Sequence, residues 1–185
     1  MNRITISIGI LFVLVLLIYL PEWLRPEQPV TPDQSEQALL PNYQATSMRS
    51  AFYNEKGELN HKVFAEKMEH YQLLGFTLFE KPQYTIYVDQ QSNPWEVEAL
   101  EGTLDENNLI RLEQDVEIRT MNSRGFVQTI RTDFIEINLQ DKTMRSDQPV
   151  EIIGQDFIIN SNGFSANLVT QQYELQDHVQ TVFAP

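Results

Sequence analysis

A chain of 185 residues with 42% hydrophobic side chains is long enough for one domain and a short additional segment, but not for a second full domain. The absence of cysteine excludes disulfide bonds, a thiolate nucleophile and cysteine-based metal sites. The 13 basic and 26 acidic residues give a formal net charge of -13, which repels phosphate backbones and argues against nucleic-acid binding.

The amino-terminal segment from Ile4 to Leu20 is apolar and uncharged, and as a helix it is just long enough to cross about 30 Å of hydrocarbon. Arg3 precedes it, so the positive-inside rule places the amino terminus in the cytoplasm and the bulk of the chain outside it. A cleaved signal peptide is the alternative, but no small-x-small cleavage site follows Leu20. The sequence therefore predicts residues 1–20 as a cytoplasmic tip and transmembrane α-helical anchor of a single-pass membrane protein.

Residues 21–42 form the next segment, which contains prolines at positions 21, 26, 29, 32 and 41 among polar residues. Proline-rich polar segments adopt extended, semi-rigid conformations. We expect this segment to be a linker that holds the domain of residues 43–185 away from the membrane.

From residue 43 onward, apolar and polar side chains alternate with a period of two. Trp95 and Val97 alternate with Glu96 and Glu98, and similar runs surround Val116 and Ile118, and Ile135 and Ile137. Such alternation is typical of strands with one buried and one solvated face. Further strands are predicted at Tyr84 to Val88, Leu109 to Leu112, Val150 to Ile153, Phe157 to Asn160, Asn167 to Leu175 and Val179 to Phe183.

Clusters of turn-forming residues separate these strands, for example Asn54 to Gly57, Asp105 to Asn108 and Asn160 to Gly163. The segment from His61 to Tyr71 has helical propensity, but Val63 and Ala65 continue the alternation, so we predict a strand. Short strands without a sustained helical pattern predict an antiparallel sandwich, barrel or jelly roll.

No residue pattern indicates catalysis. The three histidines lie far apart without metal-ligand spacing, and we expect surface or cross-strand positions for them. Nucleophile-elbow, P-loop and dinucleotide-binding motifs are absent from the sequence. The carboxylates Glu96, Glu98, Glu117 and Glu136 lie on the polar side of the alternation, where a solvated face explains them. We therefore expect neither an enzyme nor a cofactor or metal.

The order of the segments and several short motifs together resemble the LptC family of lipopolysaccharide export proteins over essentially the whole chain. The resemblance rests on the single anchor and on the following motifs: Phe52-Tyr53-Asn54-Glu55-Lys56-Gly57, Phe79-Glu80-Lys81-Pro82, Trp95-Glu96-Val97-Glu98-Ala99, Val116-Glu117-Ile118, Ile130-Arg131-Thr132, Ile137-Asn138-Leu139, Ser146-Asp147-Gln148-Pro149-Val150-Glu151-Ile152-Ile153-Gly154, and Asn162-Gly163-Phe164 followed by Asn167-Leu168.

The resemblance implies a twisted antiparallel β-jellyroll of two sheets in the periplasm, with an open groove that holds the acyl chains of lipopolysaccharide. By this resemblance, Phe79 and Tyr173 are the preferred pair for direct lipid contact. Ordinary core packing would produce the same alternation and is the alternative for each residue. The full set of expected groove residues is Phe79, Ile86, Val88, Val97, Leu112, Val116, Ile118, Ile135, Ile137, Ile152, Phe157, Ile159, Tyr173 and Leu175.

The resemblance also implies protein partners. The protein would accept lipopolysaccharide from the LptB, LptF and LptG transporter, whose LptB subunit is the ATPase, and pass it to LptA toward the outer membrane. LptF and LptG would contact the anchor helix and the amino-terminal edge at Gln44, Met48, Ala51 and Tyr53. LptA would contact the carboxy-terminal edge at Leu175, Val179, Thr181 and Phe183. A membrane-anchored β-sandwich scaffold that binds only proteins, in another envelope export system, is the alternative.

Overall fold

The computed structural model describes residues 39–88, 93–120, 127–177 and 179–183. The chain divides into two units, Met1–Gln37 and Ala38–Pro185, and all described residues belong to the second unit. The predicted anchor, and the predicted linker as far as residue 38, lie outside the described residues. Within the described residues, no helix has the length and apolar character needed to cross a membrane.

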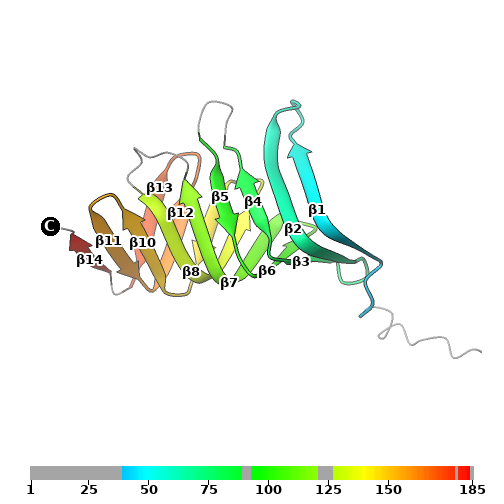
Figure 1. The fold of residues 1–185 in the computed structure, drawn as a ribbon. Coiled ribbons are helices and arrows are strands. Elements are labelled where there is room, and N and C mark those ends of the chain that lie inside the picture. Colours follow the sequence, from blue (N-terminus) through cyan, green and yellow to red (C-terminus); the bar gives the residue numbers. More distant parts are fainter. Residues whose placement is uncertain (1–38, 89–92, 121–126, 178, 184–185) are drawn as a thin grey trace, which may run out of the picture. The chain divides into compact units, whose positions relative to one another are not determined.

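The described residues form an all-β, antiparallel structure, which confirms the fold class predicted from the alternation (Figure 1). The strands are hydrogen-bonded into one 14-stranded sheet. In chain order they are β1 (Tyr43–Tyr53), β2 (Leu59–Tyr71), β3 (Phe76–Glu80), β4 (Gln83–Ile86), β5 (Trp95–Glu98), β6 (Glu101–Asp105), β7 (Leu109–Thr120), β8 (Val127–Asn138), β9 (Thr143–Ser146), β10 (Val150–Gly154), β11 (Phe157–Ser161), β12 (Gly163–Asn167), β13 (Gln172–Gln176) and β14 (Gln180–Phe183).

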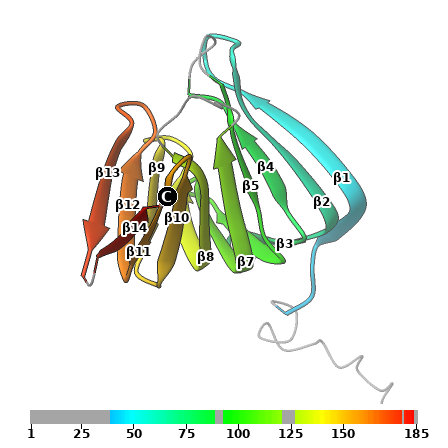
Figure 2. The ribbon, with the colours of Figure 1, turned by 60° about the vertical axis from the view of Figure 1, so that its left-hand side comes forward.

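This single sheet is folded over into two layers (Figure 2). The first layer contains β4, β5, β10, β11 and β14, and the second layer contains β3, β6, β9, β12 and β13. The long strands β2, β7 and β8 belong to both layers: β7, for example, pairs with β6 through its first half and with β5 through its second half. The two separate sheets expected from the sequence are therefore one continuous sheet.

Local irregularities in the long strands allow the sheet to fold over. In β7 the register with β8 shifts between Glu113 and Val116, and the intervening Gln114 and Asp115 have positive φ angles of 64° and 53°. In β1, Ser47 has a φ of 52° at the corresponding bend. A β-bulge bends its strand and increases the local twist, so the same strand continues into the other layer.

The topology makes the two margins of the layered sheet different. Along one margin, which we call the closed margin, the chain passes between layers within β2, β7 and β8 and in the connections β3–β4, β5–β6, β9–β10 and β11–β12. At the opposite margin, the open margin, the described connections join strands of the same layer, as in the β1–β2, β6–β7 and β8–β9 turns. Among the connections that the structure describes, those that join the two layers covalently thus lie at the closed margin only.

The core lies between the layers. The side chains of Ile110, Leu112, Ile118, Ile130 and Ile137 are completely buried. Burying an isoleucine or leucine side chain contributes about 1.5–3 kcal/mol, so this apolar interior holds the layers together. At Gly102 the backbone approaches so closely that a Cβ atom would lie 2.6 Å from Leu112 Cδ2.

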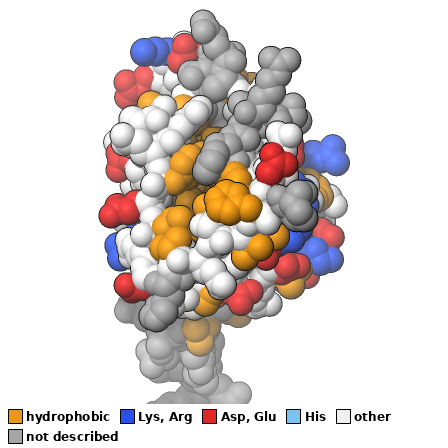
Figure 3. Space-filling model, turned by 90° about the vertical axis from the view of Figure 1, so that its left-hand side faces the viewer, with side chains coloured by type: hydrophobic (Ala, Val, Ile, Leu, Met, Phe, Trp, Pro, Cys, Tyr) orange, Lys and Arg blue, Asp and Glu red, His pale blue; other side chains and the backbone are white. Residues whose placement is uncertain are grey.

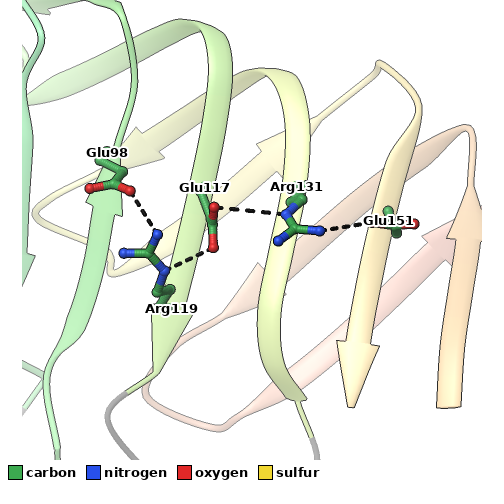
Figure 4. A network of polar contacts seen from close by, with 5 residues as sticks. All are labelled: Glu98, Glu117, Arg119, Arg131 and Glu151. Carbon is green, nitrogen blue, oxygen red and sulfur yellow. Dashed lines mark hydrogen bonds and ion pairs between the residues drawn. The ribbon is translucent and has the colours of Figure 1, made fainter.

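The outer face of the first layer carries a chain of ion pairs (Figure 4). Arg119 contacts Glu98 and Glu117, each at 2.8 Å, and Arg131 contacts Glu117 at 3.7 Å and Glu151 at 3.6 Å. These side chains come from β5, β7, β8 and β10 and are partly exposed. Exposed ion pairs contribute about 0–1 kcal/mol each, so they support the strand register more than the overall stability.

Two strand predictions have clear outcomes. The segment from His61 to Tyr71 is a strand, as the alternation predicted. The prediction of one strand from Asn167 to Leu175 is wrong, because the chain reverses between β12 and β13. Asn167 Oδ1 accepts hydrogen bonds from the backbone N–H groups of Val169 and Thr170, and this local side-chain capping stabilises the turn.

Candidate functional site

The space between the two layers is where the expected groove residues gather. Most of them belong to the buried core, with exposed fractions of 4% or less: Phe79, Ile86, Val97, Leu112, Val116, Ile118, Ile135, Ile137 and Ile152. Val88, Ile159, Tyr173 and Leu175 are partly buried and pack against this core, and Phe157 is partly buried in β11. The middle of the predicted groove is therefore closed by its own side chains in this structure.

Surface pockets occur outside this interior. One pocket of about 350 Å³ is lined by residues that include Arg49, Lys62 and Thr85. Lys62 and Thr85 alternate with the buried positions of β2 and β4, and Arg49 lies on the neighbouring β1, so the pocket lies on the outer face of the first layer. A second pocket, of about 400 Å³, includes Leu78, Glu80, Lys81 and Leu100 near the closed margin.

The carboxy-terminal end of the interior is bounded by the edge strands β13 and β14. In β14, Val182 and Phe183 are 52% and 75% exposed and Thr181 is also exposed, as is Val179 just before the strand. In β13 the inward side chains Tyr173 and Leu175 are only partly buried. Apolar side chains gather at the centre of this end (Figure 3). The residues predicted to contact LptA thus lie at an apolar edge of the sheet.

The amino-terminal end is covered by β1, which pairs with β2 along almost its whole length. On its inner face the Phe52 ring stacks on His61, with 4.4 Å between centroids, and Tyr43 stacks on His70, at 4.7 Å. Among the predicted partner residues of β1, Gln44, Ala51 and Tyr53 are exposed, whereas Met48 packs against the core.

Among the described residues, two polar side chains of the interior are buried without a hydrogen-bond partner. His61 is 6% exposed and Tyr84 is 2% exposed, and both imidazole nitrogens and the phenol oxygen are unpaired. Their rings lie 6.4 Å apart between centroids. Burial, aided by the charge of Lys142, lowers the pKa of His61 to about 4, and burial raises the pKa of Tyr84. His61 is therefore neutral at pH 7.

Near His61, a lysine connects the two layers across the open margin. Lys142, in the β8–β9 turn of the second layer, donates hydrogen bonds from Nζ to the backbone and side-chain oxygens of Asn60 at the start of β2 in the first layer. Burial lowers the pKa of Lys142 to about 8, so the amine remains mostly protonated at pH 7. Its distance from Asn60 along the sequence makes this a long-range contact between layers.

Sequence reasoning missed this polar group. His61 is a cross-strand histidine, as expected, but it is buried rather than at the surface, because Phe52 covers it. His70 is partly buried, and His178 lies outside the described residues. No local pattern distinguishes Lys142 from a solvated turn lysine. The buried Ile110 and Ile130 were also missed, although they continue the alternation of Leu112 and Thr132.

In the part of the chain that the structure describes, no three histidine, aspartate or glutamate side chains gather as a metal site would require. The carboxylates Glu98 and Glu117 share Arg119, and Glu136 pairs with Arg111 at 3.0 Å. These contacts give the carboxylates a structural role on the outer face. The chemistry that the arrangement supports is apolar burial between layers, with a polar group at the open margin.

Comparisons with known proteins agree with the resemblance seen in the sequence. The family model described as "Lipopolysaccharide-assembly, LptC-related" matches residues 8–184. The lipopolysaccharide export system protein LptC of Escherichia coli K12 is 26% identical over 145 residues, which are 77% of this chain and 75% of that protein. LptC of Haemophilus influenzae is 24% identical, with 77% of each chain covered.

A solved structure with a similar fold is LptH, the LptA-homologous periplasmic component of the lipopolysaccharide transport device of Pseudomonas aeruginosa. The TM-score is 0.53 at 10% sequence identity, and the match covers 68% of this chain and 95% of LptH. At this identity the likeness concerns the fold, which is the all-β, antiparallel fold described above.

Proposed function

The chain belongs to the LptC family, and from this premise we propose that it carries lipopolysaccharide between its two β-layers as a component of a transport bridge between the inner and outer membranes. The observation that supports this most directly is the apolar interior of a sheet that is folded over and joined covalently along one margin only. Acyl chains require such an interior, because exposing each methylene to water costs about 0.8 kcal/mol.

Loading requires the layers to separate. The interior side chains of Ile86, Leu112 and Ile135 are completely buried, so they would exchange contacts with one another for contacts with acyl chains. That exchange is close to neutral in free energy because both partners are apolar. The partly buried Ile159, Tyr173 and Leu175 toward the carboxy-terminal end are the positions where lipid contact requires the smallest movement.

The proposed handover uses the two ends of the folded sheet. LptF and LptG would contact Gln44, Met48, Ala51 and Tyr53 on β1. LptA would contact Leu175 on β13, Val179 just before β14, and Thr181 and Phe183 on β14. Edge strands present unpaired backbone groups that another chain can extend by strand addition, and the exposed Val182 and Phe183 fit such a contact. The segment from Ile4 to Leu20 would anchor the chain in the inner membrane, next to the transporter that the LptB ATPase drives.

The dense interior also favours a second candidate function, a scaffold that binds only proteins. A sandwich whose layers never separate would show the same buried residues. Both functions share the anchor and the edge strands, so only lipid contact inside the sheet distinguishes them.

Site-specific photo-crosslinking in cells tests the proposal with matched pairs of neighbouring residues. A photoreactive amino acid at the inward-facing Ile159 or Tyr173 is expected to form lipopolysaccharide adducts. The same amino acid at the outward-facing neighbours Ile158 or Glu174 is the control and should form none. Adducts with proteins alone at all four positions would support the scaffold instead.

A further inference from the structure

Near the open margin the interior contains His61, and Tyr84 lies beside it on the inner face of the first layer, deeper between the layers. The other buried polar side chains of the described residues, Thr132, Ser146 and Ser161, lie near the closed margin and are hydrogen-bonded. His61 and Tyr84 occupy adjacent strands, since His61 pairs with Ile86 and Tyr84 pairs with Val63 in the β2–β4 register. Phenylalanine would fill either position without an unpaired polar atom, and Phe52 and Phe79 already surround the pair. A buried polar group without a partner destabilises the folded state, so these two side chains are unfavourable for packing alone.

Lys142 differs from most of the cations that the structure describes. Lys67, Lys81, Arg111, Arg119 and Arg131 each contact a carboxylate. Lys142 is half-buried, and within the described residues its Nζ contacts are the two oxygens of Asn60, which carry no net charge. Burial is the main cause of the lowered pKa of His61, and the positive charge of Lys142 lowers this pKa further.

We propose that Lys142, His61 and Tyr84 form a binding site for the phosphorylated head group of the lipid, with Lys142 exchanging Asn60 for a phosphate oxygen. We call these three residues the margin site. This inference rests on the proposed function, because it assigns the polar part of the same ligand. The acyl chains pack between the layers, and the bulky sugar remains at the open margin.

The chemistry of the three groups fits a phosphorylated sugar. The lysine supplies a positive charge and only donors, which suit a phosphate. The neutral imidazole and the phenol each provide a donor and an acceptor, which suit the hydroxyl, amide or ester groups beside it. A charged phosphate also binds an ammonium group more strongly than an amide oxygen does, so it competes with Asn60.

The exchange has a mechanical consequence. The bond between Lys142 and Asn60 joins the β8–β9 turn to the start of β2 across the open margin. When a phosphate replaces Asn60 as the partner of Lys142, this connection between the layers is lost. Head-group binding thereby opens the margin at the amino-terminal end, where the acyl chains would enter.

Binding measurements on the full-length protein in nanodiscs test the site with three probes: rough-type lipopolysaccharide, the same lipid after enzymatic dephosphorylation, and inorganic phosphate. Lys142→Met is expected to weaken binding of the phosphorylated lipid about tenfold and to leave the dephosphorylated lipid unaffected. Lys142→Arg retains the charge and should retain most of the affinity. Lys62→Met removes the same charge from the outward-facing neighbour of His61 and should change neither affinity.

Tyr84→Phe separates ligand binding from folding. The variant removes only the unpaired hydroxyl, so its unfolding midpoint should equal or exceed that of the parent, while its affinity for the phosphorylated lipid falls about threefold or more. A parent-like affinity in both Lys142→Met and Tyr84→Phe would overturn the margin site. If inorganic phosphate saturates the margin site and thereby blocks lipid binding, the site is assigned to free phosphate instead.

Opening of the margin is measured separately. Because the chain has no cysteine, Glu58→Cys and Asp141→Cys introduce two specific spin labels on opposite sides of the open margin. The distance between the labels should increase with phosphorylated lipid and not with the dephosphorylated form. An unchanged distance contradicts the exchange at Lys142.

The outcomes for the two proposals are distinguishable. If the parent binds neither lipid, the proposed function itself fails; if the parent binds both forms equally, only the margin site fails.

Discussion

The two ends of the space between the layers, at β1 and at β13 and β14, differ in the side chains that they bury and expose. At the amino-terminal end, β1 covers the interior, Phe52 stacks on His61, and Lys142 connects the layers. At the carboxy-terminal end, β13 and β14 are edge strands, and Phe183 is 75% exposed. Both ends have edge strands and exposed apolar side chains, such as Tyr53 of β1 and Phe183 of β14, but within the described residues only the amino-terminal end also buries polar groups without hydrogen-bond partners.

Both arrangements are unfavourable for an isolated domain, and each is relieved by a different kind of partner. Unpaired imidazole and phenol groups are stabilised by an oxygen-rich ligand, whereas exposed apolar side chains at a sheet edge are stabilised by another β-strand. The difference teaches that the ends are not interchangeable. Under the proposed function both ends dock proteins, but only the amino-terminal end also admits the lipid, which would give the transfer a direction.

The largest effect on stability is expected from a cavity made by mutation in the core, because both ends of the molecule share this core. Ile137→Ala removes a completely buried side chain and should lower the free energy of unfolding by about 3–4 kcal/mol. Urea denaturation measures it, followed by circular dichroism and by fluorescence in a Trp23→Phe background, where Trp95 is the single tryptophan. Both signals should shift together, whereas two separate transitions would show that the ends fold independently.

A smaller effect on stability is expected from acidification, and it arises from His61 at the amino-terminal end. The pKa of His61 is about 4 in the folded protein, against 6.5 in the unfolded chain, so the unfolded chain binds the proton first. The contribution of the neutral imidazole to the free energy of unfolding is fully present above pH 6.5, and about 3 kcal/mol of it is lost as the pH drops to 4. His61→Phe lacks this titration, so the stability difference between the variant and the parent should grow in favour of the variant over this pH range. A difference that does not change with pH would contradict the buried, neutral imidazole.

The smallest effect on stability is expected at the carboxy-terminal end. Phe183→Ser changes a mostly exposed side chain and should alter the free energy of unfolding by less than about 0.5 kcal/mol. Its affinity for LptA, measured by calorimetry, should nevertheless fall because the sheet edge loses its apolar contact. Val169→Ser, at an exposed position in the β12–β13 turn, is the control and should leave the affinity unchanged. Equal affinities of both variants would remove β14 from the docking surface.

Much of the fold could be predicted because alternation is a local property of the chain. Val97, Ile118 and Ile135 were assigned to the inner face from their neighbours alone, and all three are buried. The turn at Asn167 escaped prediction because apolar residues continue on both sides of it, and its cause is hydrogen bonding by one side chain.

The sequence by itself determined the all-β class, the inner face of clearly alternating strands such as those of Val97, Ile118 and Ile135, and the family. Only the tertiary structure decided that one sheet folds over through β2, β7 and β8, that its interior is closed, and that Lys142 meets Asn60 above His61. The physical reason is that period-two patterning reports which side of a strand is apolar. Contacts between residues far apart in the chain depend on where bulges bend the strands and how the two layers then meet.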